Sequence, residues 1–338
     1  YTTAHTLSLH DALPISEIFI SLSIMFLLIL GVFKKDSSKI IHNISLLVLL
    51  ITAVITFNET LSINPTTLFN ESIIIDYLSS FMKIITLLAA FVVLLISSNY
   101  LRTFKIFKIE YPILILSSVL GMMIMISSND LIVFYMGLEL QSLALYVLAT
   151  FNRDQLKSSE AGLKYFVLSA LSSGLLLYGC SLIYGFTGST NFNVISTQFN
   201  TNEYAITFGI VFILVGLSFK ISAVPFHMWA PDVYEGSPTS VTLFFTMVPK
   251  IAALTVFIRF LYVPFLNLID QWQMILVFLS IASMLFGAIA AIGQKNLKRL
   301  IAYSSISHIG YALAGLATGS NEGIQSSVIY MTIYIIMN

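Results

Sequence analysis

Three ionisable side chains lie deep inside long apolar stretches of this 338-residue chain. Glu139 stands near the middle of the apolar run 130–149, Lys250 stands well inside the run 239–262, and Lys220 stands near the end of a third run. An ionisable group at mid-depth in a bilayer costs about 2.5–3.5 kcal/mol on insertion scales, so the three together suggest a burden approaching about 10 kcal/mol. Leucine would avoid that burden, so we expect these residues to have a function.

Lysine and glutamate are suited to the transfer of protons. A buried lysine holds its proton less firmly than an exposed one, because burial disfavours the charged form, and more firmly again when a carboxylate approaches. Small changes in separation or in water access can therefore load or unload the lysine. A line of such groups, spaced for water bridges, forms a relay that can be driven from one end.

The alternative for a single buried pair is structural, because an ion pair can fix the register of two helices. The series in this chain is longer than one pair. His308 lies mid-span in another apolar run, and four hydroxyl side chains are close to it in the sequence: Tyr303, Ser304, Ser305 and Ser307. A series of polar groups at depth favours a conduction path.

Three further basic residues fall within apolar runs. Lys164 follows Glu160 by four residues, one turn inside the expected inner edge of its span. This spacing suits a surface salt bridge and suits equally a relay at the entry side of a proton path. Lys83 and Arg259 lie near outer helix ends, where we expect their long side chains to snorkel to the headgroups.

The stretch after Lys220 is rich in helix-breaking and ionisable residues. Pro225 should interrupt the helix, free backbone carbonyls and supply a hinge close to Lys220. His227, Asp232 and Glu235 follow, and the loop that holds them contains no Lys or Arg to balance the two carboxylates. We expect this loop to have a function; an ordinary structured loop is the alternative.

Composition requires that these residues sit in a membrane protein. Hydrophobic residues make up 57% of the chain and charged residues 9%, about a third of what a soluble domain carries. The sixteen basic and sixteen acidic residues cancel, which gives no indication of nucleic-acid binding. One cysteine excludes a cysteine-built metal or iron–sulfur site within the chain, and no nucleotide-binding glycine motif is present.

Apolar runs of 18 to 25 residues predict an all-α, polytopic bundle of transmembrane helices, because an isolated segment in lipid must satisfy its own backbone hydrogen bonds. The runs lack the alternation of a β-barrel. We predict ten complete spans and a partial eleventh, with a break in the seventh, at residues 17–33, 40–57, 74–98, 112–128, 130–149, 160–187, 204–222, 239–262, 272–292, 299–318 and 323–338.

The basic residues outside the spans predict the topology. All eleven lie in odd-numbered connections between spans, which the positive-inside bias assigns to the cytoplasm or the mitochondrial matrix. They are Lys34, Lys35, Lys39, Arg102, Lys105, Lys108, Arg153, Lys157, Lys295, Lys298 and Arg299. The even-numbered connections contain Glu59, Glu71, Glu203 and Asp270 and no basic residue. We therefore expect the native N-terminus to lie outside.

Both ends of the sequence are unusual. Residues 1–16 begin without Met and resemble a translated sequencing adapter, so we expect them not to be native. The chain stops at Asn338 inside an apolar run, so we expect a C-terminal part to be missing.

Three motifs resemble a known family, the antiporter-like membrane subunits of respiratory complex I, the proton-pumping NADH:quinone oxidoreductase. They are FKISAVPFHMWAPDVYEGSPTSVTLFFTMVPKIAAL at 219–254, NDLIVFYMGLELQSLALYVLATF at 129–151 and QKNLKRLIAYSSISHIGYALAGLATG at 294–319. PDVYEGSPT within the first resembles the subunit N branch, the counterpart of mitochondrial subunit 2, rather than its paralogues L and M. The resemblance covers nearly everything after residue 16.

The resemblance implies a fold of fourteen helices with two inverted five-helix repeats, each with a broken helix and a buried lysine. It implies N-terminal helices at 17–110, a first, proton-translocating repeat at 111–262 and a truncated second repeat at 263–338. It gives Glu139, Lys220 and Lys250 the central roles in proton translocation. It gives relay roles to Lys164, His227 and His308.

The resemblance also implies a function and partners. We expect a translocase subunit that couples electron transfer from NADH to quinone with proton pumping. NAD, flavin, iron–sulfur clusters and quinone would be held by partner subunits, with no cofactor or metal in this chain. Partners would be other membrane-arm subunits, including antiporter-like paralogues, and the lipid bilayer. A bacterial inner membrane is favoured over the mitochondrial one.

Two other functions stay open. One is a subunit of a cation/proton antiporter or of a related membrane-bound hydrogenase complex, in which sodium-dependent proton movement would be expected. The other is a scaffold that stiffens the membrane arm without carrying protons.

Overall fold

A computed structural model describes residues 14–34, 37–60, 65–198 and 203–338 of the chain. The segment 1–13, most of the stretch predicted to be non-native, lies outside the described residues. The first helix begins at Ile15, two residues before the predicted boundary.

Every apolar run predicted to span the membrane is a helix, so the all-α bundle is confirmed. The helices are α1 (Ile15–Phe33), α2 (Ser38–Thr60), α3 (Tyr77–Thr103), α4 (Glu110–Ser127), α5 (Leu131–Ala149), α6 (Leu156–Thr187), α8 (Glu203–Lys220), α10 (Thr239–Tyr262), α11 (Ile269–Ile292), α12 (Leu297–Leu316) and α13 (Asn321–Met337). Among the described residues, eight of these are long and apolar enough to cross a membrane; α8, α12 and α13 are not among the eight.

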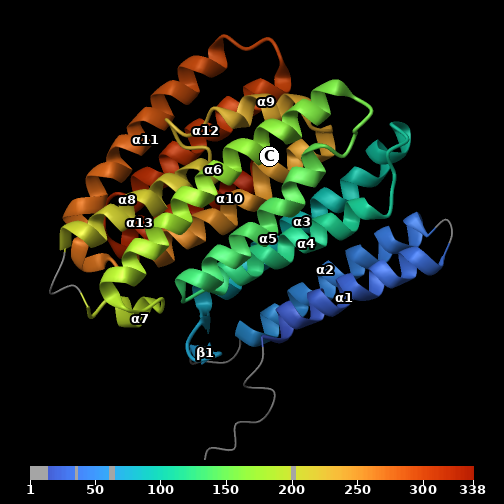
Figure 1. The fold of residues 1–338 in the computed structure, drawn as a ribbon. Helices are drawn as coiled ribbons and strands as arrows, with labels where there is room; N and C mark the ends of the chain where they lie inside the picture. The colour runs from blue at the N-terminus through green and yellow to red at the C-terminus, as the bar shows by residue number, and fades with distance from the viewer. Residues whose placement is uncertain (1–13, 35–36, 61–64, 199–202) are drawn as a thin grey trace, which may run out of the picture.

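Short elements outside the long helices were not predicted. Strands β1 (Thr66–Leu68) and β2 (Ile73–Ile75) form an antiparallel hairpin between α2 and α3. The four-residue helix α7 (Phe192–Ile195) lies at the same end of the bundle (Figure 1). Asn129 and Asn191 both donate to the backbone carbonyl of Glu71, which ties the hairpin to this end.

The long helices run roughly side by side, with α1 and α2 at one edge of the bundle and α11 at the opposite edge (Figure 1). Between these edges lies α10, which is almost entirely buried. Its central place explains why Lys250, near its midpoint, is 2% exposed. The α3–α4, α5–α6 and α11–α12 connections, which carry basic residues, lie at the end opposite the hairpin (Figure 1).

Close packing between α4 and α5 fixes the direction in which Glu139 points. A Cβ atom on Gly121 would lie 2.5 Å from the backbone nitrogen of Gln141, and one on Gly137 would lie 2.8 Å from that of Met125. Gly137 and Gln141 are one turn apart, on the face of α5 roughly opposite Glu139. The contact with α4 therefore turns Glu139 toward the other helices.

Candidate functional site

Lys220 lies at the end of α8, where three neutral hydroxyl groups surround its ammonium group. Its Nζ atom donates to Ser169 Oγ at 2.7 Å and to Ser142 Oγ at 2.8 Å, and lies 3.5 Å from the Tyr146 hydroxyl. The residue is 8% exposed. Among the described residues, no carboxylate forms an ion pair with it. Its direct hydrogen-bond partners among the described residues are neutral hydroxyl groups.

The helix break after Lys220 is a complete capping motif. Ser222 has a left-handed backbone with φ of 59°. Its N–H donates to the Phe219 carbonyl at 3.0 Å, and the N–H of Ala223 donates to the Ser218 carbonyl at 2.9 Å. This is the Schellman arrangement, with serine at the position that glycine usually takes. Lys220 is the last helical residue, where the negative end of the helix dipole favours a cation.

Two expectations about the break need correction. The helix ends five residues before Pro225, because the left-handed Ser222 ends it and the proline lies beyond the cap. The Ser218 and Phe219 carbonyls are also not free, since backbone N–H groups donate to both and Trp229 Nε1 donates to the Phe219 carbonyl at 2.9 Å. The chain resumes as the short helix α9 (Trp229–Gly236), in a segment predicted as loop.

Glu139 lies on α5, one turn before Ser142. Its Oε1 atom is buried and has no hydrogen-bond partner among the described residues. It interacts with Lys220 electrostatically but forms no direct ion pair with it. An acid and a base that influence each other's charge titrate as a coupled pair.

Lys250 and His308 form a second polar group, on α10 and α12. The Lys250 ammonium has no hydrogen-bond partner in the described part of the chain and lies 5.9 Å from the centre of the Tyr234 ring. His308 is near enough to interact with it electrostatically. The Nδ1 atom of His308 lies 2.7 Å from the Tyr330 hydroxyl. A buried ammonium held by one ring face is poorly compensated.

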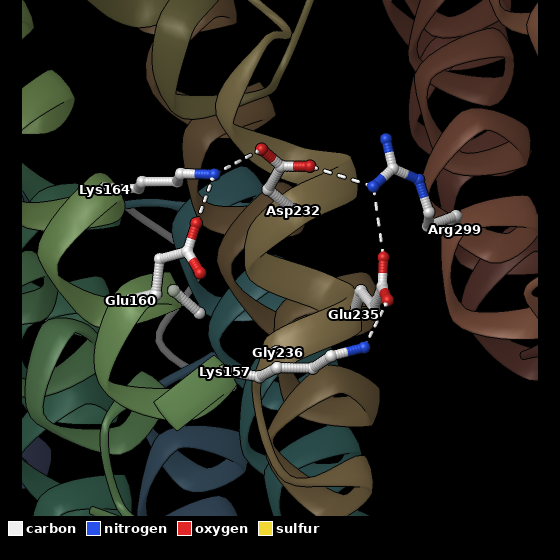
Figure 2. Close-up of a pocket in the computed structure, with 8 residues that line it drawn as sticks. Lys157, Glu160, Lys164, Asp232, Glu235, Gly236 and Arg299 are labelled. Atoms are coloured by element: carbon white, nitrogen blue, oxygen red, sulfur yellow. Dashed lines mark hydrogen bonds and ion pairs between the residues drawn. The ribbon is translucent and has the colours of Figure 1, made fainter. Parts of the chain in front are cut away.

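Lys164 takes part in ion pairs at the end of the bundle that carries the basic connections. Its Nζ atom lies 2.8 Å from Glu160 Oε1, as the sequence spacing predicts, and 2.9 Å from Asp232 Oδ2 on α9. Figure 2 shows Asp232 between Lys164 and Arg299, whose Nη1 atom is 3.0 Å from Asp232 Oδ1. The residues surround a pocket of about 210 Å³. The predicted salt bridge between Lys164 and Glu160 is present.

Glu235, one turn after Asp232, completes this arrangement. Arg299 and Lys157 donate to its two carboxylate oxygens at 3.1 and 3.2 Å. These hydrogen bonds, the one from Arg299 above all, hold the pKa of Glu235 below its usual value. We call Lys157, Glu160, Lys164, Asp232, Glu235 and Arg299 the charge cluster. The carboxylates that lack basic neighbours in sequence thus receive them from α6 and α12.

His227 lies in the segment between α8 and α9, apart from the other predicted site residues. Its ring is 4.5 Å from that of Phe286 on α11, and its Nδ1 atom is buried without a hydrogen-bond partner in the described part of the chain. Among the described residues, no hydrogen bond or ion pair joins it to Lys220 or Lys164.

Lys83 and Arg259 do not snorkel, which corrects the prediction. Lys83 is 1% exposed and forms a direct ion pair with Glu17 on α1. Arg259 is 4% exposed, pairs with Asp76 and donates from Nε to the Ile126 carbonyl at 2.8 Å. Burial against neighbouring helices leaves neither side chain a path to the headgroups. Both are structural cross-links between helices.

The paired Lys83 provides a test of this structural role. Lys83→Met alone should leave Glu17 as an unpaired buried charge and destabilise the protein by about 3–5 kcal/mol. The double variant Glu17→Gln with Lys83→Met should recover most of that stability. Thermal unfolding of the detergent-solubilised protein measures both. A double variant as unstable as the single one would contradict the pairing.

The hydroxyl groups around Lys220 were missed from the sequence. Ser142 and Tyr146 follow Glu139 by three and seven residues, so they lie on one face of α5, and this spacing was a usable signal. Ser169 comes from α6, and nothing in its local sequence points to Lys220. Among the described residues, no group of three His, Cys, Asp or Glu could hold a metal ion.

Residues 128–338, which include all six predicted site residues, match the family model described as NADH:quinone oxidoreductase/Mrp antiporter, TM. NADH-quinone oxidoreductase subunit N of Pelagibacter ubique (strain HTCC1062) is 76% identical over 322 residues, covering 95% of this chain and 68% of that protein. The chain belongs to the subunit N family of NADH-quinone oxidoreductase. The resemblance drawn from the sequence is thereby confirmed.

Solved structures agree with membership of the subunit N family. A chain of respiratory complex I from Thermus thermophilus superposes with a TM-score of 0.81 at 31% identity, covering 95% of this chain and 68% of that one. A chain of the archaeal membrane-bound sulfane sulfur reductase superposes with a TM-score of 0.84 at 24% identity, with the same coverage. The second likeness concerns the fold alone.

Proposed function

We propose that this chain carries protons across the membrane as a subunit of NADH-quinone oxidoreductase, with Lys220 as the central proton carrier. The observation that supports this most directly is the hydroxyl surround of Lys220, which has no carboxylate in direct contact. A lysine locked in an ion pair, as Lys83 is, keeps its proton. Lys220 is instead surrounded by hydroxyl groups, which can accept a hydrogen bond from the protonated lysine and donate one to the neutral lysine.

Glu139 acts as the partner that changes the charge balance of Lys220. Approach of the ionised carboxylate favours the protonated lysine, and its neutralisation or withdrawal favours release. Ser142 and Tyr146 lie on the same face of α5 and can pass the proton between the two groups. Three residues fixed on one helix keep this geometry constant.

Lys250 and His308 continue the path beyond Lys220. Each lies inside the bundle, and the two side chains interact electrostatically. We assign Lys164 to the entry side, where the charge cluster opens to the surface. His227, whose buried Nδ1 atom has no hydrogen-bond partner among the described residues, is assigned a relay role beside the helix break.

The proposed assembly follows from the family. We infer that the chain works with other membrane-arm subunits, including antiporter-like paralogues, in a bacterial inner membrane. NADH oxidation, flavin, iron–sulfur clusters and quinone reduction belong to partners in this proposal. The N-terminal helices at 17–110, the first repeat at 111–262 and the start of a second repeat at 263–338 remain the proposed division.

A cation/proton antiporter subunit is the second candidate, because the matching family model includes Mrp antiporters. The two candidates differ in their ion dependence. Proton movement that requires sodium, in a complex that oxidises no NADH, would favour the antiporter. NADH-driven acidification that is independent of sodium would favour the first proposal.

Lys250 allows stability and function to be separated. Lys250→Met removes a buried ammonium that has no hydrogen-bond partner in the described chain, so the free energy of unfolding should rise by about 1–3 kcal/mol. Proton pumping by the assembled complex should fall by about tenfold, as expected on removal of a proton-transfer group. Thermal unfolding and NADH-driven acidification measure the two effects. A variant that is both more stable and fully active would remove Lys250 from the path.

A further inference from the structure

The short helix α9 is attached to its surroundings at both ends. At its C-terminal end, Asp232 and Glu235 pair with basic residues of α6 and α12. At its N-terminal end, Trp229 reaches the helix break next to Lys220. Eight residues of α-helix are about 12 Å long, so a shift at one end must move the other.

Trp229 contacts both the helix break and α6. It is 4% exposed, and its Nε1 atom donates to the Phe219 carbonyl, on the residue directly before Lys220. Its indole ring stacks on the Tyr165 ring with 4.5 Å between centres and 11° between planes. The indole thus fixes both the backbone that carries Lys220 and a side chain of α6.

Tyr165 extends this contact to the hydroxyl groups around Lys220. Its ring meets that of Tyr146 edge to face, with centres 5.0 Å apart. The Tyr146 hydroxyl lies 2.6 Å from Ser169 Oγ, and that Oγ accepts from Lys220 at 2.7 Å. A displaced indole would therefore disturb the lysine from two sides, through its backbone and through its hydrogen-bond partners.

The other end of α9 is held too firmly to move independently. A Cβ atom on Gly236 would lie 2.4 Å from the Lys157 carbonyl oxygen, so the backbones of α9 and α6 touch there. Lys298 of α12 donates to the Ser237 carbonyl at 2.6 Å. Figure 2 shows Asp232 and Glu235 pointing toward the basic side chains of both neighbouring helices. The charge cluster is thus a clamp on α9 and not an isolated surface pair.

We propose that Trp229 is a positioning residue for Lys220 and that the ion pairs of Asp232 and Glu235 keep it in place through α9. The inference rests on the proposed role of Lys220. Isolated surface salt bridges contribute little, but here Asp232 and Glu235 share Arg299, and the short helix carries their combined restraint to the break. The clamp joins α6 and α12, so a movement between these helices is felt at Lys220.

The test uses the full-length chain in its assembled complex, with the rate of NADH-driven proton pumping as the readout. Trp229→Phe keeps the aromatic ring but loses the donor to Phe219. Asp232→Asn removes the charge that joins Lys164 and Arg299. Each should assemble normally and lower proton pumping by about tenfold, since small misplacements of a reacting group have effects of this size. Asp232→Glu should restore pumping to within about twofold of the wild type, which a merely structural loss would not predict.

Asp154→Asn is the matched control, because Asp154 is exposed at the same end of the bundle and forms no ion pair among the described residues. It should pump normally. Normal pumping by Trp229→Phe, or equal loss in Asp232→Asn and Asp232→Glu, would overturn the inference. If Trp229→Phe does not assemble, the comparison of pumping by Asp232→Asn and Asp232→Glu tests the inference.

Lys220→Met in the same assay separates this inference from the proposed function. Full pumping by that variant would overturn the role of Lys220 itself. Loss of pumping in Lys220→Met together with normal pumping in Trp229→Phe would overturn the positioning role alone.

Discussion

Lys220→Met should lower NADH-driven quinone reduction by the coupled complex by about tenfold or more. Methionine has a similar volume and an apolar side chain that packs well in a buried site, so folding should be retained. What is lost is the ammonium group that Ser142 and Ser169 accept from, and with it a transferable proton. A group that transfers a proton in a reaction typically raises its rate by about a hundredfold or more, so a large fall in turnover is expected. Turnover in inside-out membrane vesicles measures it.

The buried pair on α1 and α3 supplies the matched control for Lys220. Glu17→Gln with Lys83→Met also removes a buried lysine, but one that is locked to a carboxylate. That double variant should keep its turnover once assembled. Equal losses in both cases would indicate that any buried lysine is needed for assembly and that Lys220 has no special role.

Glu139→Gln should have an effect of similar size. The amide has nearly the shape of the carboxylate, so the packing of α5 against α4 at Gly137 should be preserved. The amide carries no charge, so Lys220 loses the electrostatic partner that changes its proton affinity. We expect turnover to fall by about tenfold in the same vesicles.

Two further variants make the Glu139 experiment decisive. Glu139→Asp keeps the charge on a shorter side chain, so it should retain more turnover than Glu139→Gln. Glu322→Gln removes an exposed carboxylate from α13 and should leave turnover unchanged. If Glu139→Gln were as active as the wild type, the carboxylate would have no part in the path.

The long helices and the buried ionisable residues could be predicted because each depends on local sequence. A run of apolar residues specifies a helix in lipid without help from the rest of the chain. A lone lysine within such a run, such as Lys250, is evident for the same reason. Their predicted depth in the bundle is matched by their burial.

The partners of those residues could not be predicted, because they depend on tertiary packing. Lys83 looked free to snorkel until the place of α1 brought Glu17 beside it. Asp232 has no basic neighbour in the sequence, but in the structure Lys164 of α6 and Arg299 of α12 form ion pairs with it. Distant side chains that meet leave no local pattern.

The helix break shows a third kind of difference between sequence and structure. A proline is a strong signal, so Pro225 was expected to end the helix. The cap is instead made by Ser222 in a left-handed conformation, which serine adopts far less often than glycine. The helix therefore ends at Lys220, two residues before the predicted end of the span and five before Pro225.

Protons pumped per NADH oxidised, measured in proteoliposomes that contain the complete complex, test the central role of Lys220 most directly. The complex with Lys220→Met should assemble to normal levels and pump measurably fewer protons per NADH than the wild type, while Glu17→Gln with Lys83→Met pumps as the wild type does. An unchanged proton-to-NADH ratio in the assembled Lys220→Met complex would contradict the proposal that Lys220 carries protons.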